Sequence, residues 1–293
     1  MEHQLPLSSS ALKPFSPVDY LLIGHVTQDV LPDGCVRLGG TVTFSGLTAH
    51  ALGHSVGIVT ACAPECNLSP LDNLSVLRVN SEYSTTFQNI STPQGRVQYL
   101  YHQATQLNAT HLAQQWLTPA IVHLGPVAAE VDPQIFRVFT DSLICLTAQG
   151  WLRGVDQEDR VHPVKWPFSH ELLKAAHACV ISMEDVRGEE EVIEEFAAMC
   201  RLLVVTENKL GARVYWNGDV HNFAAPTVDI IEDTGAGDIF AACFFHRLFV
   251  TKDPWEAARF AVKLAAYSVT RTYLESVPSP KEIEAAKVEI IQG

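Results

Sequence analysis

The sequence lacks an excess of positive charge. Its 293 residues include 20 Lys and Arg against 33 Asp and Glu, which gives a formal net charge of -13. An acidic surface repels nucleic acid and anionic lipid, so neither is expected as a partner. It does not exclude a phosphate-bearing ligand, because backbone dipoles and a bound cation can hold phosphates locally.

Export and membrane signals are also missing. Residues 1–17 have no basic start and no apolar core, so they predict a flexible leader and not a signal peptide. The apolar stretch 239–250 is interrupted by His246 and Arg247 and is too short to span a bilayer. The 7 Cys are odd in number and scattered, which argues against a disulfide framework. Reduced thiols and a cytoplasmic location are expected.

Short apolar runs alternate with helical patterns along most of the chain. Strands are predicted at 19–24, 55–60, 120–125, 142–147, 178–183 and 201–206, and helices at 41–53, 132–141, 168–177 and 188–200. Alternation of this kind implies an α/β fold of three layers, α/β/α, with a mainly parallel central sheet. No internal repeat or low-complexity segment interrupts it.

One region departs from this alternation. Residues 81–90 and 96–102 are β-rich, and the TPQG between them has turn chemistry, so they predict a hairpin. With 36–40 as a further strand, the hairpin predicts a small β lid built from about 33–43 and 75–105. The exposed edges of such a lid make a homodimer through it plausible.

The segment that carries the chemistry reads EDTGAGD, from Glu232 to Asp238. Gly235, Ala236 and Gly237 let the backbone approach a ligand closely, and a helical pattern follows. The first amides of a helix are unpaired and suit an anion that gains charge during phosphoryl transfer. Asp238 could accept a proton from an attacking hydroxyl. An ordinary helix cap after a Gly-rich turn explains the same residues about as well.

This segment resembles the signature of the ribokinase-like, or PfkB, sugar-kinase family. GHVTQD at 24–29 resembles the first-strand motif whose terminal Asp, here Asp29, contacts substrate hydroxyls. Gly39 and Gly40 resemble the diglycine at the lid junction. The resemblance implies a ribokinase-like kinase domain over 18–293.

The second half of the chain resembles the same family in order. Residues 204–215, with Thr206 and Gly211, resemble the nucleotide-side segment, 260–271 the helix flanking the adenine pocket, and 276–279 the closing turn. The resemblance covers about 18–285, which makes a chance match of one motif improbable.

The family's roles are carried over by resemblance. They make Asp238 the base that deprotonates the acceptor, and the amides of Gly235, Ala236 and Gly237 an anion hole for the transferred phosphoryl group. Thr234 opens the turn, and its hydroxyl either points at phosphate or only caps the turn. ATP and Mg²⁺ are the implied cofactors, with a monovalent cation such as K⁺ behind the anion hole.

Several positions depart from the family pattern. Glu232 stands where many members have Asp, which leaves the cation dependence open. The family's Asn-x-x-Glu magnesium motif is not intact, and Glu184 and Asp185 are the nearest carboxylates. They are candidate metal ligands, or simply the solvated start of a helix. Val262 replaces a frequent Asn, so the nucleotide preference is also open.

The expected acceptor is a small polyol, either a sugar or an inositol. LTAQGWLR at 146–153 resembles a segment of the archaeal myo-inositol kinase branch, which makes Gln149 and Arg153 candidate pocket residues. Arg153 alternatively pairs with Asp156 or Glu158. Phe44 stands near the position of an Asn common in sugar kinases, which weakens a ribose or fructose assignment.

Other functions are compatible with parts of the sequence. A nucleoside kinase of the same fold and a non-catalytic sugar or nucleotide sensor are the main alternatives. A Rossmann-type dehydrogenase needs a more Gly-rich first turn than GHVTQD supplies. The pairs His50 and His54, and Cys62 and Cys66, lack further ligands nearby and are interpreted as ordinary side chains.

Overall fold

The computed structural model describes residues 15–92, 95–166 and 169–287. Most of the predicted leader therefore lies outside the described residues, as do two residues of the predicted TPQG turn. The part of the leader that is described packs on the domain. The Phe15 ring lies 4.7 Å from the Trp116 ring, and Trp116 Nε1 donates to the Ser16 carbonyl at 2.9 Å.

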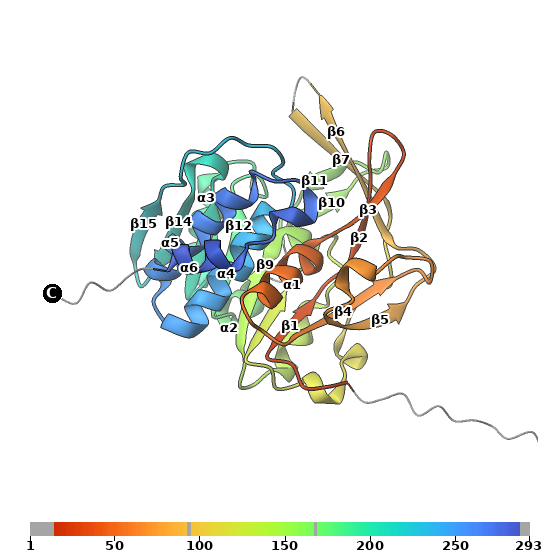
Figure 1. The fold of residues 1–293 in the computed structure, drawn as a ribbon, viewed down its shortest axis with the longest axis horizontal. Coiled ribbons are helices and arrows are strands. Elements are labelled where there is room, and N and C mark those ends of the chain that lie inside the picture. The colour runs from red at the N-terminus through yellow and green to blue at the C-terminus, as the bar shows by residue number, and fades with distance from the viewer. Residues whose placement is uncertain (1–14, 93–94, 167–168, 288–293) are drawn as a thin grey trace, which may run out of the picture.

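A nine-stranded sheet runs through the molecule in the order β15-β14-β13-β12-β9-β8-β1-β4-β5 (Figure 1). All neighbouring pairs are parallel except those of β13 with β14 and β14 with β15. The central strands are buried along their length, as their apolar sequences require when helices cover both faces. The mainly parallel α/β/α prediction is confirmed. The strands are β1 (Tyr20–Ile23), β4 (Val56–Cys62), β5 (Ser75–Asn80), β8 (Ile121–Leu124), β9 (Leu143–Thr147), β12 (Ala178–Ser182), β13 (Leu202–Thr206), β14 (Ala212–Trp216) and β15 (Asp219–Phe223).

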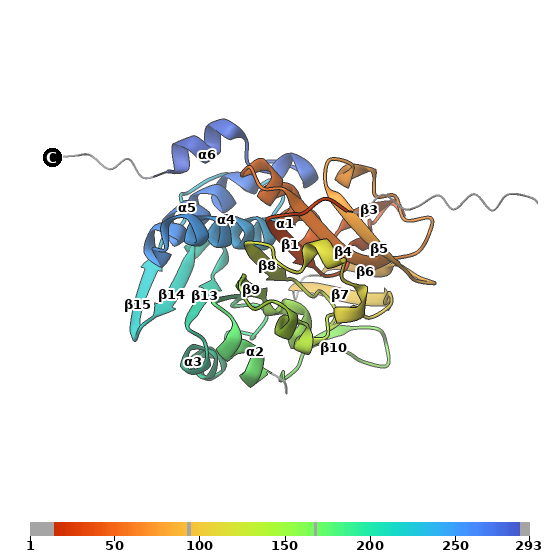
Figure 2. The ribbon, with the colours of Figure 1, turned by 90° about the horizontal axis from the view of Figure 1, so that it is seen from below.

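Helices cover the two faces of the sheet (Figure 2). One face carries α1 (Thr41–Ala51), α4 (Ala236–Thr251), α5 (Pro254–Ser268) and α6 (Pro280–Ala286), and the other carries α2 (Ser169–Ala175) and α3 (Glu190–Met199). The helix expected at 132–141 is instead a 3₁₀ helix, Pro133–Val138, as short helical pieces often are. Along the described ranges, no helix has the length and hydropathy needed to cross a bilayer.

Helix α4 is apolar on nearly all sides because it is enclosed. Its residues Phe240, Phe244 and Phe245 are buried between the sheet and the neighbouring helices. Helix α5 begins at Pro254, and Asp253 caps it by accepting from the amides of Trp255 and Glu256. This packing fixes the start of α4, which carries the EDTGAGD segment, against the middle of the sheet.

The lid is a separate four-stranded sheet in the order β3-β2-β6-β7. It consists of β2 (Thr27–Val30), β3 (Val36–Gly39), β6 (Thr85–Thr92) and β7 (Gly95–His102), with the short ribbon of β10 (Arg153–Val155) and β11 (Val161–Pro163) beside it (Figure 1).

The predicted lid boundaries differ from the observed ones. Residues 75–80 pair in parallel with β4 as the edge strand of the main sheet, and 41–43 already belong to α1. Residues 27–30, which the sequence placed with the first-strand motif, are a lid strand. Apolar residues in 75–80 match the sheet as well as the lid, and only the partner strand decides between them.

Candidate functional site

The turn before α4 has the geometry of an anion site. Gly235 is the N-cap residue with φ 83°, and a Cβ added there would lie 2.4 Å from Phe44 Cδ1, so only glycine fits. The Ala236 amide donates to the Asp233 carbonyl at 3.1 Å. Within the described ranges, the amides of Gly235, Gly237 and Asp238 have no hydrogen-bond acceptor. These three amides are therefore available as donors. The Ala236 amide, which was also predicted to be a donor, is instead hydrogen-bonded within the turn.

Asp238 lies in the first turn of α4 and is held by α1. The Thr41 side chain hydrogen-bonds to its carboxylate, and Ser45 Oγ donates to its carbonyl at 2.9 Å. Burial raises the pKa of Asp238 to about 6, the nearby carboxylates of Asp185 and Asp29 add to the rise, and Thr41 and Arg153 oppose it. A carboxyl group with this pKa is a base suited to neutral pH.

Asp29, on lid strand β2, lies against the diglycine. Thr27 Oγ1 donates to Asp29 Oδ1 at 3.0 Å, and a Cβ on Gly39 would lie 2.4 Å from Asp29 Oδ2. Gly40 has φ 89°, and a Cβ there would meet the His25 carbonyl at 2.5 Å. Two glycines are therefore needed where the lid strand β3 turns into α1.

Arg153 and Asp185 complete the group of charges around Asp238. Gln149 Nε2 donates to Asp185 Oδ1 at 3.3 Å, and the Ser182 amide donates to Asp185 Oδ2 at 2.8 Å. Arg153 Nη1 donates to the Val127 carbonyl at 3.2 Å, and the Arg153 charge acts on both Asp185 and Asp238. Burial raises the pKa of Asp185, and the charge of Arg153 opposes that rise.

One alternative partner of Arg153, Asp156, is engaged elsewhere. Asp156 Oδ1 accepts from the amides of Glu158 and Arg160, each at 2.9 Å, within its own turn. The guanidinium of Arg153 lies instead 5.9 Å from the centre of the Phe87 ring, on lid strand β6. The structure thus brings Asp29, Arg153 and Asp238 together from distant parts of the sequence.

The two candidate metal ligands are not equivalent. Glu184 is exposed and accepts from Asn208 Nδ2 at 2.9 Å, while Asp185 lies near Arg153 and Asp238. No group of three or more His, Cys, Asp or Glu in the described part of the chain could hold a metal. Magnesium that arrives with phosphates needs only one or two protein carboxylates. Asp185 fits that requirement and Glu184 does not.

Thr206 and Gly211, which the sequence assigns to the nucleotide side, flank the loop between β13 and β14. Thr206 ends β13, with its hydroxyl 3.4 Å from the Ile181 carbonyl. Gly211 has φ 104°, and a Cβ there would lie 1.9 Å from the Phe223 carbonyl, so the loop packs directly on the end of β15. The Thr234 hydroxyl accepts from Arg37 Nη2 at 3.4 Å, and among the described residues no side chain caps the start of α4.

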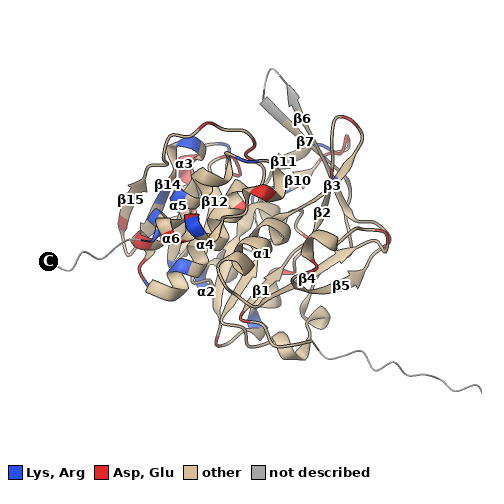
Figure 3. Cartoon of the chain, viewed as in Figure 1, with Lys and Arg blue, Asp and Glu red and all other residues tan. Residues whose placement is uncertain are grey.

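A depression of about 520 Å³ lies next to this loop. Phe223, Ala224 and Pro226 form one side of it, and Val262 of α5 contributes to the other. The remaining lining residues are polar or basic and comprise His221, Asn222, Arg259 and Lys263. Figure 3 shows that Lys and Arg lie mainly around β12 to β15 and their helices, with few on the lid.

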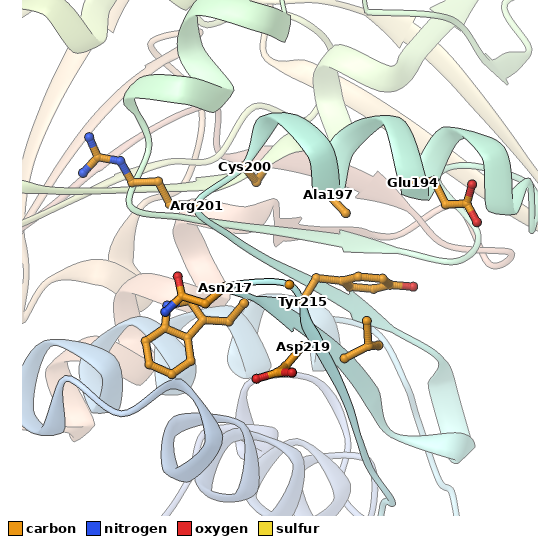
Figure 4. Close-up of a pocket in the computed structure, with 10 residues that line it drawn as sticks. Glu194, Ala197, Cys200, Arg201, Tyr215, Asn217 and Asp219 are labelled. Carbon is orange, nitrogen blue, oxygen red and sulfur yellow. The ribbon is translucent and has the colours of Figure 1, made fainter.

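A second depression, of about 450 Å³, lies away from the charges around Asp238 (Figure 4). It lies between α3 and the β14–β15 hairpin and is lined by Tyr215, Asn217 and Asp219. Trp216 of β14 pairs with Leu202 at the start of β13, which places this hairpin turn at the amino ends of the parallel strands. The charges around Asp238 lie at the opposite, carboxyl ends.

Two polar residues of the site were not singled out from the sequence. Glu130 is fully buried and accepts from the amides of His25 at 2.9 Å and Ala128 at 2.7 Å, joining the loops after β1 and β8. The sequence feature that could have indicated Glu130 is an acidic residue inside the apolar run AAEV. Thr41, which binds Asp238, carried no signal beyond its place after the diglycine.

His54 of the histidine pair contacts other polar side chains, and both members of the cysteine pair are buried. His54 Nδ1 lies 3.1 Å from Asp19 Oδ1 and His54 Nε2 lies 2.9 Å from His246 Nδ1, so His54 does have an acidic neighbour that the sequence did not reveal. All seven cysteines are free thiols. Cys62 and Cys66 are both buried, as expected for ordinary thiols.

Comparisons with known proteins find a family match for part of the chain. Residues 169–282 match the family described as pfkB family carbohydrate kinase. A fructokinase from Escherichia coli is 26% identical over 194 residues, which are 59% of this chain and 62% of that enzyme.

Solved structures share the fold over nearly the whole chain. A pyrophosphate-dependent kinase of the ribokinase family, complexed with a pyrophosphate analog and myo-inositol, superposes with a TM-score of 0.75 at 21% identity, covering 91% of this chain and 99% of that one. A ribokinase from Thermotoga maritima superposes with a TM-score of 0.69 at 17% identity, covering 92% and 99%. These likenesses establish a ribokinase-like fold.

Proposed function

We propose that this chain, which contains a pfkB family carbohydrate kinase domain within a ribokinase-like fold, transfers the terminal phosphoryl group of ATP to a hydroxyl of a small polyol. One observation carries the proposal. A carboxyl group with a pKa of about 6, Asp238, lies in the first turn of a helix whose Gly235 and Gly237 amides have no acceptor in the described structure. Such a helix start accepts a phosphoryl group, and the carboxylate accepts the proton of the attacking hydroxyl.

Each residue of the site then has a defined task. Asp238 takes the acceptor proton as the hydroxyl attacks, and the amides of Gly235 and Gly237 stabilise charge on the transferred phosphoryl oxygens. Asp29 accepts hydrogen bonds from acceptor hydroxyls, and Arg153 orients the acceptor from the other side. Gln149 holds Asp185 and so acts on the pocket through it.

The donor occupies the side of Thr206 and Gly211. The base of ATP would lie in the depression beside Val262, and Arg259 and Lys263 at its edge would attract the phosphate chain. Asp185 would hold magnesium that arrives with the phosphates, and the ion would neutralise phosphate charge. Burial disfavours a charged Asp185 without a cation nearby, which is consistent with this task.

Pyrophosphate is the second candidate donor. The observation that favours it is the likeness, over 91% of this chain, to a kinase described as pyrophosphate-dependent and complexed with myo-inositol. That likeness and the 146–153 segment both favour an inositol as acceptor, while the partial match to a fructokinase favours a sugar. A nucleoside is the third acceptor class.

The test is a phosphoryl-transfer screen with purified protein. ATP and pyrophosphate are each supplied with Mg²⁺, and inositols, hexoses, pentoses and nucleosides serve as acceptors, with phosphorylated product read by mass spectrometry. We expect product from an inositol, and a rate that rises with pH through about 6 because Asp238 must be deprotonated. No product from any pair would refute the kinase proposal. Full ligand-dependent function in Asp238→Asn would instead favour the alternative of a non-catalytic sugar or nucleotide sensor.

Association through the lid is a further part of the proposal. Val36, Ile90 and Tyr101 are large apolar residues that lie exposed on lid strands. Edge strands with exposed apolar side chains are pairing surfaces, so a homodimer would cover them. Analytical ultracentrifugation of the wild type and of Ile90→Lys tests this directly, since a lid dimer predicts a shift of the variant toward monomer.

A further inference from the structure

Arg37 connects the lid to the loop that precedes the anion site. It lies on lid strand β3, and its Nη2 donates to Glu232 Oε1 in an ion pair and to Thr234 Oγ1 at 3.4 Å. Its guanidinium also lies 5.2 Å from the centre of the Tyr273 ring. These partners are separated from Arg37 by about two-thirds of the chain, so the contact is purely tertiary.

Glu232 is held on both of its carboxylate oxygens. Oε1 accepts from Arg37, and Oε2 accepts from the Tyr273 amide at 3.1 Å. Burial alone would raise the pKa of Glu232, but the bonds from Arg37 and Tyr273 outweigh burial and keep that pKa below its usual value. The amides of Ile231 and Glu232 both donate to the Val269 carbonyl, at 2.8 and 3.2 Å. The loop is thus fixed by the end of α5 on one side and by the lid on the other.

The same lid strands carry an acceptor residue. Asp29 on β2 is paired directly with Arg37 on β3 in the antiparallel register. Tyr273 strengthens the connection, because its hydroxyl donates to the Leu38 carbonyl of β3 at 2.7 Å. One position of the lid therefore sets both the acceptor contact at Asp29 and the partner of Glu232.

We propose that Arg37 is a positioning residue that fixes the anion loop when the lid is seated, and that its guanidinium supplies the positive charge this loop requires. The proposal rests on the kinase function proposed above. It has a chemical consequence for the cation dependence that the sequence left open. Glu232 already has a cationic partner from the protein, so the wild type needs no inorganic monovalent cation at this place.

Removing the guanidinium leaves Glu232 partly buried and without its cation, which is costly unless another cation enters. In Arg37→Gly the vacated volume can admit a guanidinium ion or K⁺. We expect kcat to fall about 10- to 100-fold in this variant, with the acceptor KM changing less, because a loop displaced by an ångström loses transition-state contacts. Added guanidinium should restore a measurable part of kcat.

Arg247→Met is the matched control. Arg247 is also ion-paired to a carboxylate, Glu256, and also lies over a ring, 5.4 Å from the centre of Phe260. Its side chain is 15% exposed, against 23% for Arg37, and it lies near the far end of α4. We expect this control to lower the unfolding temperature at least as much as Arg37→Gly does, yet to leave kcat within about twofold.

The measurements are kcat and KM for donor and acceptor, with K⁺, Na⁺, tetramethylammonium and guanidinium each varied. Wild-type activity that is independent of the cation, with rescue of Arg37→Gly by guanidinium and not by tetramethylammonium, supports the proposal. A wild type that requires K⁺, an unchanged kcat in Arg37→Gly, or no rescue overturns it.

Amide exchange separates this inference from the kinase proposal. Hydrogen exchange over residues 231–238 needs no turnover, so it can be compared between wild type, Arg37→Gly and Arg247→Met even if no substrate is found. Faster exchange only in Arg37→Gly, reversed by guanidinium, supports the proposed positioning role of Arg37. Equal exchange in all three proteins refutes it, whereas an empty substrate screen refutes only the kinase.

Discussion

The two ends of helix α4 show how similar burial produces different outcomes. Asp238 in its first turn has its pKa raised to about 6, and His246 two turns later has its pKa lowered to about 4, in both cases chiefly because burial penalises the charged form. His246 contacts His54 at 2.9 Å, and His54 contacts Asp19 at 3.1 Å. The polar side chains at this end of α4 are therefore hydrogen-bonded to one another.

The end at Asp238 differs in what surrounds the carboxyl group. Charged groups reach it from the lid, from the segment after β9 and from the segment after β12, and amides beside it have no acceptor in the described structure. A shifted pKa alone therefore does not mark a functional site. The combination of a shifted pKa with unmatched donors and converging charges does.

The largest expected effect comes from removing the carboxylate. Asp238→Asn should lower kcat by about 100- to 10,000-fold because the acceptor loses its base. The variant should unfold at the same or a higher temperature near pH 8. The folded-state pKa of Asp238 is raised, so its contribution to stability is present at low pH and is lost as pH rises through about 6.

His246→Gln is the matched change at the other end of α4. It should leave kcat within about twofold, since His246 touches no proposed reacting group. Steady-state kinetics and thermal unfolding of both variants test the comparison. A strong activity loss in His246→Gln, or a mild one in Asp238→Asn, would contradict the roles assigned to the two ends.

A smaller effect is expected from the glycines. Gly235→Ala combines a φ of 83° with a contact of 2.4 Å to Phe44, so it should lower both the unfolding temperature and kcat, the latter by about tenfold or more. Gly237→Ala meets nothing within 4 Å, so it should leave the unfolding temperature unchanged and lower kcat by crowding the phosphoryl group.

Gly218→Ala, in the β14–β15 turn, controls for backbone strain alone. Its φ is 87° and a Cβ there meets nothing within 4 Å. We expect a fall of about 2–4 °C in unfolding temperature per kcal/mol of strain, with normal kcat. Equal kinetics for Gly237→Ala and Gly218→Ala would show that the amides at 235–237 do not face the reaction.

The smallest expected effect is on how the stability of the folded protein depends on pH. The folded-state pKa of His246 is about 4, below the ordinary value of 6.5, so between these values the unfolded chain binds the proton and the folded chain does not. Stability contributed by neutral His246 is therefore lost as pH falls from about 6.5 to about 4. His246→Gln should flatten the unfolding temperature over this window by a few degrees.

The control for this titration is Asp238→Asn, which removes a group of the opposite sign. Thermal unfolding followed by circular dichroism at pH 4.5, 5.5, 6.5 and 8 distinguishes the two. A wild type and a His246→Gln variant with parallel pH profiles would show that His246 does not titrate differently on folding.

Much of the fold followed from short-range patterns in the sequence. Short apolar runs such as 142–147 favour strands buried on both faces, and their alternation with helices indicates a mainly parallel sheet. The predicted lid boundaries were wrong at 75–80, because a strand with exposed and apolar residues fits either sheet until its partner is known. The predicted helix at 132–141 became a short 3₁₀ helix.

The candidate site divides in the same way. EDTGAGD indicated Asp238 and the glycine amides because the conformation of small residues before a helix is set by the neighbouring sequence. The sequence did not show that the Ala236 amide hydrogen-bonds within the turn. Arg37 and Glu130 were not singled out, since their roles depend on partners far away in the chain. Glu184 and Asp185 are adjacent in sequence, yet the structure directs only Asp185 toward Asp238.

By itself, the sequence determined the layered α/β architecture and the Gly-rich helix start before Asp238, because both arise from periodicity and from residues a few positions apart. The tertiary structure alone decided which charges meet at Asp238, how the lid contacts Glu232 through Arg37, and what pKa Asp238 has. Those features depend on burial and on distances between distant segments, which no local pattern contains.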